Sequence, residues 1–148
     1  MLSASVLERA LSSLCNAKSK GVIGVGIDVL HMPRLKAVLG RRPERFLTRV
    51  LTKAELGDFQ KLKDEVGGQV DHDRAVQFVG ARWALKEATY KALTPLHKLT
   101  WQDVTVIKDQ GKPCLFIPEK EKFGVGKAHC SVTHDGEYLV AQVLFESP

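Results

Sequence analysis

The sequence predicts a single α+β domain. A strand pattern over residues 22–30 comes first, the longest helical pattern covers residues 74–93, and short strand patterns separated by turns fill the chain after residue 104. Helices therefore occupy most of the first two thirds, and an antiparallel meander ends the chain, which is typical of an α+β fold. The chain has 148 residues, 44% of them hydrophobic, so it can bury a core without disulfides.

The first strand carries two different faces. Side chains of residues 22–30 alternate between two sets, as the period of a strand requires: Ile23, Val25, Ile27 and Val29 form one set, and Val22, Gly24, Gly26 and Asp28 form the other. We expect the β-branched set to face the core. The glycines on the other face would let a ligand or another backbone come close to Asp28.

A basic helical segment follows the strand. After Pro33 the pattern becomes helical and carries the cations Arg34, Lys36, Arg41, Arg42, Arg45 and Arg49. Thr52 followed by Glu55 is a capping box, which predicts the start of another helix.

The helix predicted over residues 74–93 is apolar on more than one side. One stripe holds Phe78, Ala81, Leu85, Ala88 and Ala92; nearly opposite lie Gly80, Ala84, Glu87 and Lys91; and Val79, Trp83 and Tyr90 add apolar surface on a third side. We therefore expect a largely buried helix in which Glu87 has crowded surroundings.

The end of the chain predicts an antiparallel sheet. Its strands are expected at residues 104–108, 114–117, 128–134 and 138–145. The turns are expected at Gly111–Lys112–Pro113 and at Asp135–Gly136.

Charge and composition narrow the classes of partner and compartment. The net charge of +5 and a pI near 9.2 favour an anionic partner, whether nucleic acid, membrane surface, phosphorylated small molecule or acidic protein. No apolar run reaches the roughly 18 to 20 residues that cross a bilayer, so no membrane association is expected. The three cysteines, Cys15, Cys114 and Cys130, form no metal-binding spacing and are interpreted as reduced thiols of an intracellular or mitochondrial protein.

Residues 1–20 differ from the rest of the chain. Leu7, Leu11 and Leu14 recur at helical spacing among small residues, with several cations and the single acid Glu8. The pattern is shared by a mitochondrial presequence and by an additional N-terminal helix, and it gives the two interpretations equal weight.

Two carboxylates are candidates for a metal site. Asp28 on the glycine face of a strand and Glu87 on a buried helix could converge on Mg²⁺, which takes one or two protein carboxylates together with waters and phosphates. On the residues alone, an ion pair between Glu87 and Lys91 at i,i+4 is the more common arrangement. His134 and Lys112 are likewise more often ordinary turn residues.

Five segments together resemble the ordered motifs of holo-acyl-carrier-protein synthases, which are short 4'-phosphopantetheinyl transferases. The segments are GVGIDVLHMPRL at 24–35, RFLTRVLTKAEL at 45–56, FVGARWALKEATYKAL at 78–93, GKP at 111–113 and SVTHDGEYLVAQV at 131–143. The resemblance covers residues 24 to 143 and implies a transferase domain at 21–148, with a long buried helix packed on a small antiparallel sheet.

The resemblance also implies roles for individual residues. Asp28 and Glu87 match the Mg²⁺ ligands, and Lys91 matches a residue that contacts phosphate. Contacts to coenzyme A are implied for Arg82, Lys112, Thr133 and His134. Contacts to the acidic recognition helix of a carrier protein are implied for Arg34, Arg45 and Phe46. The local variation His31, Met32 and Pro33 just before Arg34 affects the partner contacts and leaves the carboxylates untouched.

The implied reaction moves the 4'-phosphopantetheine of coenzyme A to a serine of an apo acyl carrier protein and releases 3',5'-ADP. Either Glu87 or a water on the metal would accept the serine proton. The resemblance further implies a homotrimer and a role in fatty acid biosynthesis and lipid metabolism, in mitochondria or the cytoplasm. Two alternatives are a non-catalytic carrier-binding subunit and a basic nucleic-acid-binding module; the latter predicts aromatic residues among the arginines, and residues 34–49 contain only Phe46.

Overall fold

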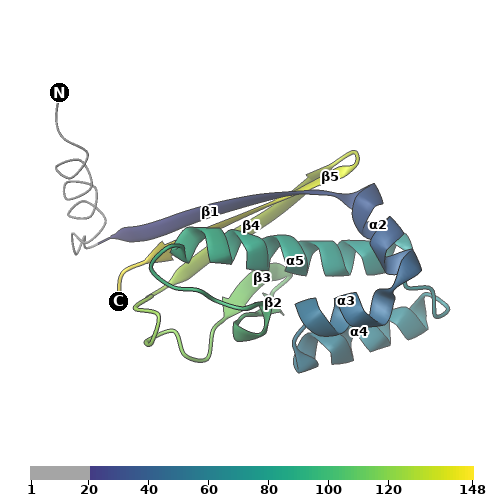
Figure 1. Ribbon diagram of the computed structural model, residues 1–148, viewed down its shortest axis with the longest axis horizontal. Coiled ribbons are helices and arrows are strands. Elements are labelled where there is room, and N and C mark those ends of the chain that lie inside the picture. Colours follow the sequence, from purple (N-terminus) through teal and green to yellow (C-terminus); the bar gives the residue numbers. More distant parts are fainter. Residues whose placement is uncertain (1–20) are drawn as a thin grey trace.

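The structure, a computed structural model, describes residues 21–148 (Figure 1). The elements in chain order are β1 (Val22–His31), α2 (Met32–Arg41), α3 (Pro43–Val50), α4 (Lys53–Glu65), α5 (Asp73–Leu93), the short 3₁₀ helix η1 (Trp101–Asp103), β2 (Thr105–Asp109), β3 (Lys112–Phe116), β4 (Ala128–Asp135) and β5 (Tyr138–Glu146). Both interpretations of residues 1–20 lie outside the described residues.

The strands form two sheets. One is an antiparallel sheet with the order β1-β5-β4, and the other is the β2-β3 hairpin. The meander predicted after residue 104 is therefore wrong, because β2 and β3 form a hairpin of their own. Strand β5 instead pairs with β1 from the start of the described chain, with Asp28 opposite Ala141. Strand periodicity shows which residues share a face but does not show which strands are neighbours.

Helix α5 lies along one face of the three-stranded sheet (Figure 1). It is the predicted long helix, and most of its residues are buried. Two glycines make the close contact possible, because a Cβ at Gly24 or Gly26 would lie 2.0 or 1.8 Å from the carbonyl oxygen of Ala92 or Ala88. The glycine face of β1 therefore lies against the backbone of α5. This confirms one of the two expectations for that face, namely that another backbone comes close to it.

The prediction that the β-branched face of β1 is core is wrong. Val25, Ile27 and Val29 are 49%, 52% and 60% exposed, since the helix covers the opposite face. The core instead combines α5 with the inner side chains of β5, such as Val143 and Phe145. An apolar strand face on the surface of one chain is unusual and suggests contact with another molecule.

Two local predictions have different outcomes. The capping box is confirmed, because the Thr52 N–H donates to Glu55 Oε2 at 2.8 Å at the start of α4. The β2–β3 turn, however, is formed by Gln110 and Gly111, which both have positive φ, and Lys112 is the first residue of β3. A two-residue hairpin of this kind needs positive φ at both central positions, and this moves the turn one residue earlier.

The basic segment forms two short helices beside α5. Pro33 and Pro43 stand in the first turns of α2 and α3, where the missing N–H costs no helical hydrogen bond. Each helix buries leucine or valine side chains, while the arginines stay exposed. Across residues 21–148, no helix combines the length and apolar character needed to cross a membrane.

Candidate active site

Asp28 and Lys91 form an ion pair where β1 meets α5. The Lys91 ammonium lies 2.7 Å from Asp28 Oδ1 and also donates to the Ile27 carbonyl at 3.1 Å. The Asp28 side chain is 17% exposed and that of Lys91 is 49% exposed. Lys91 therefore pairs with Asp28 across the two elements, and the i,i+4 pair with Glu87, which the residues alone favoured, does not form.

Glu87 lies on the side of a cleft of about 640 Å³ between α5, α3 and η1. Its Oε1 accepts a hydrogen bond of 2.5 Å from the indole N–H of Trp101. Arg49 and Tyr90 line the same cleft, and the Arg49 guanidinium lies 5.0 Å from the centre of the Trp101 ring. Glu87 is half-buried and faces this open cleft, so the crowding expected around it is only partial.

The packing of β1 on α5 sets which turn of the helix lies beside Asp28. Gly24 lies against Ala92 and Gly26 against Ala88, so two strand residues advance about as far as one turn of helix. Continued by two more strand residues, this spacing places Asp28 beside the turn of α5 that precedes Ala88. Among residues 21–148, no group of three or more His, Cys, Asp or Glu side chains could hold a metal, so any ion here would need further ligands from substrate or water.

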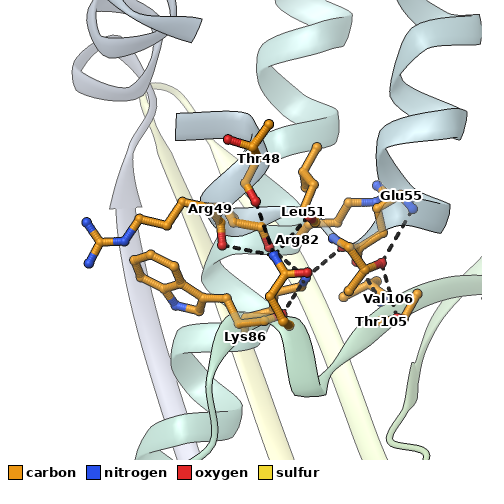
Figure 2. A network of polar contacts seen from close by, with 12 residues as sticks. Thr48, Arg49, Leu51, Glu55, Arg82, Lys86, Thr105 and Val106 are labelled. Atoms are coloured by element: carbon orange, nitrogen blue, oxygen red, sulfur yellow. Dashed lines mark hydrogen bonds and ion pairs between the residues drawn. The ribbon is translucent and has the colours of Figure 1, made fainter. Parts of the chain in front are cut away.

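A second lysine of α5 forms a buried ion pair (Figure 2). Lys86 Nζ lies 2.6 Å from Glu55 Oε2 and donates to the carbonyls of Val50 at 2.7 Å and Trp101 at 2.9 Å. Glu55 also accepts from the Val106 N–H at 2.7 Å. Burial lowers the pKa of Lys86, and the hydrogen bond with Glu55 opposes that shift. This network joins α3, α4, α5, η1 and β2 at one point.

Arg82 and His134 line a different cleft, of about 570 Å³. Arg82 is 6% exposed and stacks on Phe78 at 3.3 Å from the ring centre. Burial lowers its pKa to about 10, so the guanidinium stays charged at neutral pH. Its Nε is buried without a hydrogen-bond partner. With Lys108 on the same cleft, the arrangement suits an anionic ligand.

The other two residues implied to contact coenzyme A lie apart from this cleft. Thr133 stands opposite Val140 on the outer face of the sheet, whereas its neighbour His134 is on the inner face. Lys112 is exposed at the start of β3, opposite Asp109. One chain therefore does not gather all the predicted residues into one pocket.

The residues implied to face a carrier protein lie on α2 and α3. Arg34 and Arg45 are exposed. Phe46 is half-buried, with its ring edge-on to Trp83 at a centroid distance of 5.0 Å. The local variation before Arg34 leaves that arginine accessible.

Three residues near Glu87 were not predicted from the sequence to have a role in the site: Trp101, Lys86 and Arg49. A signal existed for Lys86, because a lysine in a helix that is apolar on several sides needs a buried partner. No sequence pattern indicated Trp101, because η1 is too short to show a period. Its contact with Glu87 depends on the path by which the loop after α5 brings η1 back beside that helix.

The family to which this chain belongs follows from comparison with known proteins. The model of the 4'-phosphopantetheinyl transferase superfamily matches residues 24–143. The chain belongs to this superfamily. The holo-[acyl-carrier-protein] synthase of Bacillus subtilis (strain 168) is 34% identical over 128 residues, which cover 84% of this chain and 96% of that protein. The synthase of Exiguobacterium sp. is 33% identical and is covered to 93%.

A solved structure of this transferase family supports the same assignment. The holo-(acyl-carrier-protein) synthase of Bacillus anthracis str. Ames, in complex with CoA (3',5'-ADP), has a TM-score of 0.68 and 30% identity, covering 86% of this chain and 99% of that one. The α+β transferase fold and the resemblance to holo-acyl-carrier-protein synthases are thereby confirmed. The non-catalytic and nucleic-acid-binding alternatives are not favoured.

Proposed function

We propose that this protein transfers the 4'-phosphopantetheine of coenzyme A to a serine of an apo acyl carrier protein. The observation that carries the proposal is the ion pair of Asp28 with Lys91 at the β1–α5 contact, with Glu87 on the same helix four residues before Lys91, in a chain whose superfamily match spans residues 24–143. A site with two carboxylates and an ammonium suits the transfer of a phosphate group, because most of the catalysis is positioning and charge stabilisation.

The reaction exchanges the phosphoanhydride bond of the coenzyme A pyrophosphate for a phosphate ester bond to serine. The serine Oγ bonds to the β-phosphorus of coenzyme A, and the bond from that phosphorus to the bridging oxygen breaks. The departing 3',5'-ADP keeps the bridging oxygen and its electron pair, and the serine proton passes to a base. Glu87 or a water molecule accepts this proton.

Asp28 and Glu87 are the residues that would hold Mg²⁺. Their donor chemistry fits: in the described part of the chain, the second oxygen of each carboxylate has no hydrogen-bond partner, and Mg²⁺ commonly combines one or two carboxylates with substrate phosphates. When bound, the ion supplies positive charge that offsets charge developing on the phosphate oxygens. Lys91 adds a fixed positive charge beside Asp28.

Arg82 and His134 are the best-supported contacts for the coenzyme A phosphates. The unpartnered Nε of Arg82 provides a buried donor, and a phosphate oxygen would satisfy it. Lys112 and Thr133, which lie elsewhere on the chain, are proposed to approach the same substrate from a neighbouring subunit.

The carrier protein is proposed to dock on the outer sides of α2 and α3. Arg34 and Arg45 are exposed there, and a cationic surface accelerates the encounter with an acidic partner. Phe46 adds an aromatic contact. A carrier protein of fatty acid biosynthesis is the proposed substrate class.

A homotrimer with shared sites is the proposed assembly. Arg82 and Glu87 are five residues apart on α5, which places them about 140° apart around the helix, and their two clefts share no lining residue. A substrate that contacts both sets would therefore bridge two chains. The exposed Val25, Ile27 and Val29 provide an apolar surface for closed cyclic association.

Light scattering tests this assembly. Wild type should have about three chain masses, and Val25→Glu should be monomeric and inactive, because it places a charge in the apolar contact without disturbing the single chain. Ile107→Glu, the same kind of change at an exposed position of the other sheet, should remain trimeric. A fully active wild-type monomer would refute the proposal.

We also propose that the carrier is mitochondrial, on the basis of the composition of residues 1–20. Fusing these residues to a fluorescent reporter should direct it to mitochondria. A diffuse cytosolic signal would favour the cytoplasmic alternative.

Mass spectrometry of the carrier tests the activity itself. The protein is incubated with coenzyme A, Mg²⁺ and apo carrier proteins, including a mitochondrial one, and each carrier is then weighed. The expected result is a gain of one phosphopantetheine, abolished by a chelator and by replacement of the acceptor serine with alanine. No gain across several carriers would contradict the proposed function.

A further inference from the structure

Trp101 stands beside one of the two proposed metal ligands. Its indole N–H donates to Glu87 Oε1 at 2.5 Å across the cleft. A hydrogen bond to an ionised carboxylate is stronger than one between neutral groups, so it holds the oxygen in place. It also leaves Oε2 of Glu87 as the oxygen with its lone pairs available.

The main chain around Trp101 is held firmly. Its own carbonyl accepts a hydrogen bond of 2.9 Å from the buried Lys86 ammonium. The side-chain amide of the next residue, Gln102, donates to three carbonyls at the end of α3, those of Thr48, Arg49 and Leu51. Figure 2 shows these α3 residues beside Lys86 and Glu55.

The Trp101 ring is held as well. The Arg49 guanidinium lies 5.0 Å from its centre, within the range of a cation–π contact. The ring thus has a cation over one face and a carboxylate at its N–H. A side chain that only filled space would need neither polar contact.

We infer that Trp101 is a positioning residue that fixes the Glu87 carboxylate for metal binding through its indole N–H. The inference rests on the proposed function. Glutamate has three rotatable side-chain bonds, so a free Glu87 would sample many positions of its carboxylate in the open cleft. The anchored indole selects one of them, as hydrogen-bonded partners of metal ligands generally do.

Replacing Trp101 with phenylalanine tests the inference. Trp101→Phe keeps an aromatic ring under Arg49 and removes the N–H donor. The Mg²⁺ concentration for half-maximal transfer should rise about tenfold, at the lower end of the effect typical for such partners. Saturating Mg²⁺ should restore the rate to within a few-fold of wild type, which general structural damage would not allow.

The chain contains a matched control. It has two tryptophans, and the indole N–H of Trp83 is buried without a hydrogen-bond partner. Trp83→Phe makes the same chemical change one turn of α5 before Glu87 and should leave the Mg²⁺ requirement unchanged. Equal Mg²⁺ requirements for wild type and Trp101→Phe would overturn the inference.

Terbium luminescence gives a readout that does not depend on activity. Tb³⁺ binds oxygen ligands and emits when a nearby indole transfers energy to it. In Trp83→Phe, where Trp101 is the remaining tryptophan, the protein should show sensitised Tb³⁺ emission that Mg²⁺ displaces and that the additional change Glu87→Gln removes. Absence of sensitised emission would refute the placement of Trp101 beside the ion even if Trp101→Phe failed to fold.

The two experiments separate failure of the inference from failure of the proposed function. If the wild type modifies no carrier, the proposed transfer is wrong, and the terbium emission still reports on Trp101 and Glu87. If the wild type is active and Trp101→Phe has the same metal dependence, only the positioning role is wrong.

Discussion

Helix α5 contributes the lysine to each of two lysine–carboxylate ion pairs. The two pairs have nearly the same distance between nitrogen and oxygen but very different surroundings. Lys86 and Glu55 are 2.6 Å apart, with side chains 0% and 1% exposed, whereas Lys91 and Asp28 are 2.7 Å apart and 49% and 17% exposed. The distance between the charged atoms alone does not distinguish the two pairs. Burial and the number of further partners distinguish them.

The buried pair uses almost all of its hydrogen-bonding capacity within the protein. Lys86 donates to two carbonyls in addition to Glu55, and Glu55 accepts from two backbone N–H groups. The Asp28 carboxylate, by contrast, keeps an oxygen for a ligand. We therefore expect the first pair to stabilise the fold, and we propose that the second takes part in the chemistry.

The largest effect is expected from breaking the buried pair. Lys86→Met or Glu55→Gln leaves a buried charge without its partner, so each should lower the free energy of unfolding by about 3–5 kcal/mol. That is a large fraction of the stability of a typical domain. Urea unfolding followed by circular dichroism measures the change.

The double variant Lys86→Met with Glu55→Gln is the control for this prediction. It carries neither charge of the pair, and removal of both charges of such a pair is often nearly neutral. It should therefore be more stable than either single variant. A double variant that is less stable than both would show that the two charges do not act as a pair.

The next largest effect is expected from the proposed metal carboxylates. Asp28→Asn or Glu87→Gln keeps the side-chain volume but removes a charged oxygen ligand, so transfer should fall by about a thousandfold, or roughly 4 kcal/mol of transition-state stabilisation. Circular dichroism should show an intact fold, and more Mg²⁺ should be needed for the residual activity. Wild-type rates in limiting Mg²⁺ would show that the active site lies elsewhere.

The parts of the fold that depend on local sequence pattern were predictable. The parts that depend on contacts between distant segments were not. The α5 helix, the capping box of α4 and the strand at residues 22–30 follow from periodicity and cap chemistry. The pairing of β1 with β5 does not, because it joins the two ends of the described chain. The exposed face of β1 was mispredicted because burial of Gly24 and Gly26 depends on the approach of α5.

The candidate site was predictable from motif resemblance more than from the residues themselves. Asp28 and Lys91 pair across β1 and α5, whereas spacing in the sequence alone favoured an ion pair of Lys91 with Glu87. Arg82 and His134 also share a cleft. Trp101 could not be foreseen, because only the return of η1 to α5 brings its indole to Glu87.

A smaller effect is expected at Lys91. Lys91→Met keeps the apolar stem and removes the positive charge beside Asp28, so the transfer rate should fall about 10- to 100-fold, or roughly 1.4–2.7 kcal/mol. The Mg²⁺ requirement should not change, because an ammonium is not a metal ligand. A rise in that requirement as large as in Asp28→Asn would show that Lys91 acts mainly by holding Asp28.

The smallest expected effect is the contribution of the exposed pair to stability. A double-mutant cycle with Asp28→Asn and Lys91→Met, measured by urea unfolding at fixed protein concentration without metal or substrate, should give a coupling of about 0.2–1 kcal/mol. Salt at 1 M should reduce it, because the screening length there is about 3 Å. The same cycle at Lys86 and Glu55 should give a coupling of a few kcal/mol that salt hardly changes, since water and ions do not reach that pair. A coupling above about 2 kcal/mol at Asp28 and Lys91 would make this pair structural as well and would remove the distinction between the two.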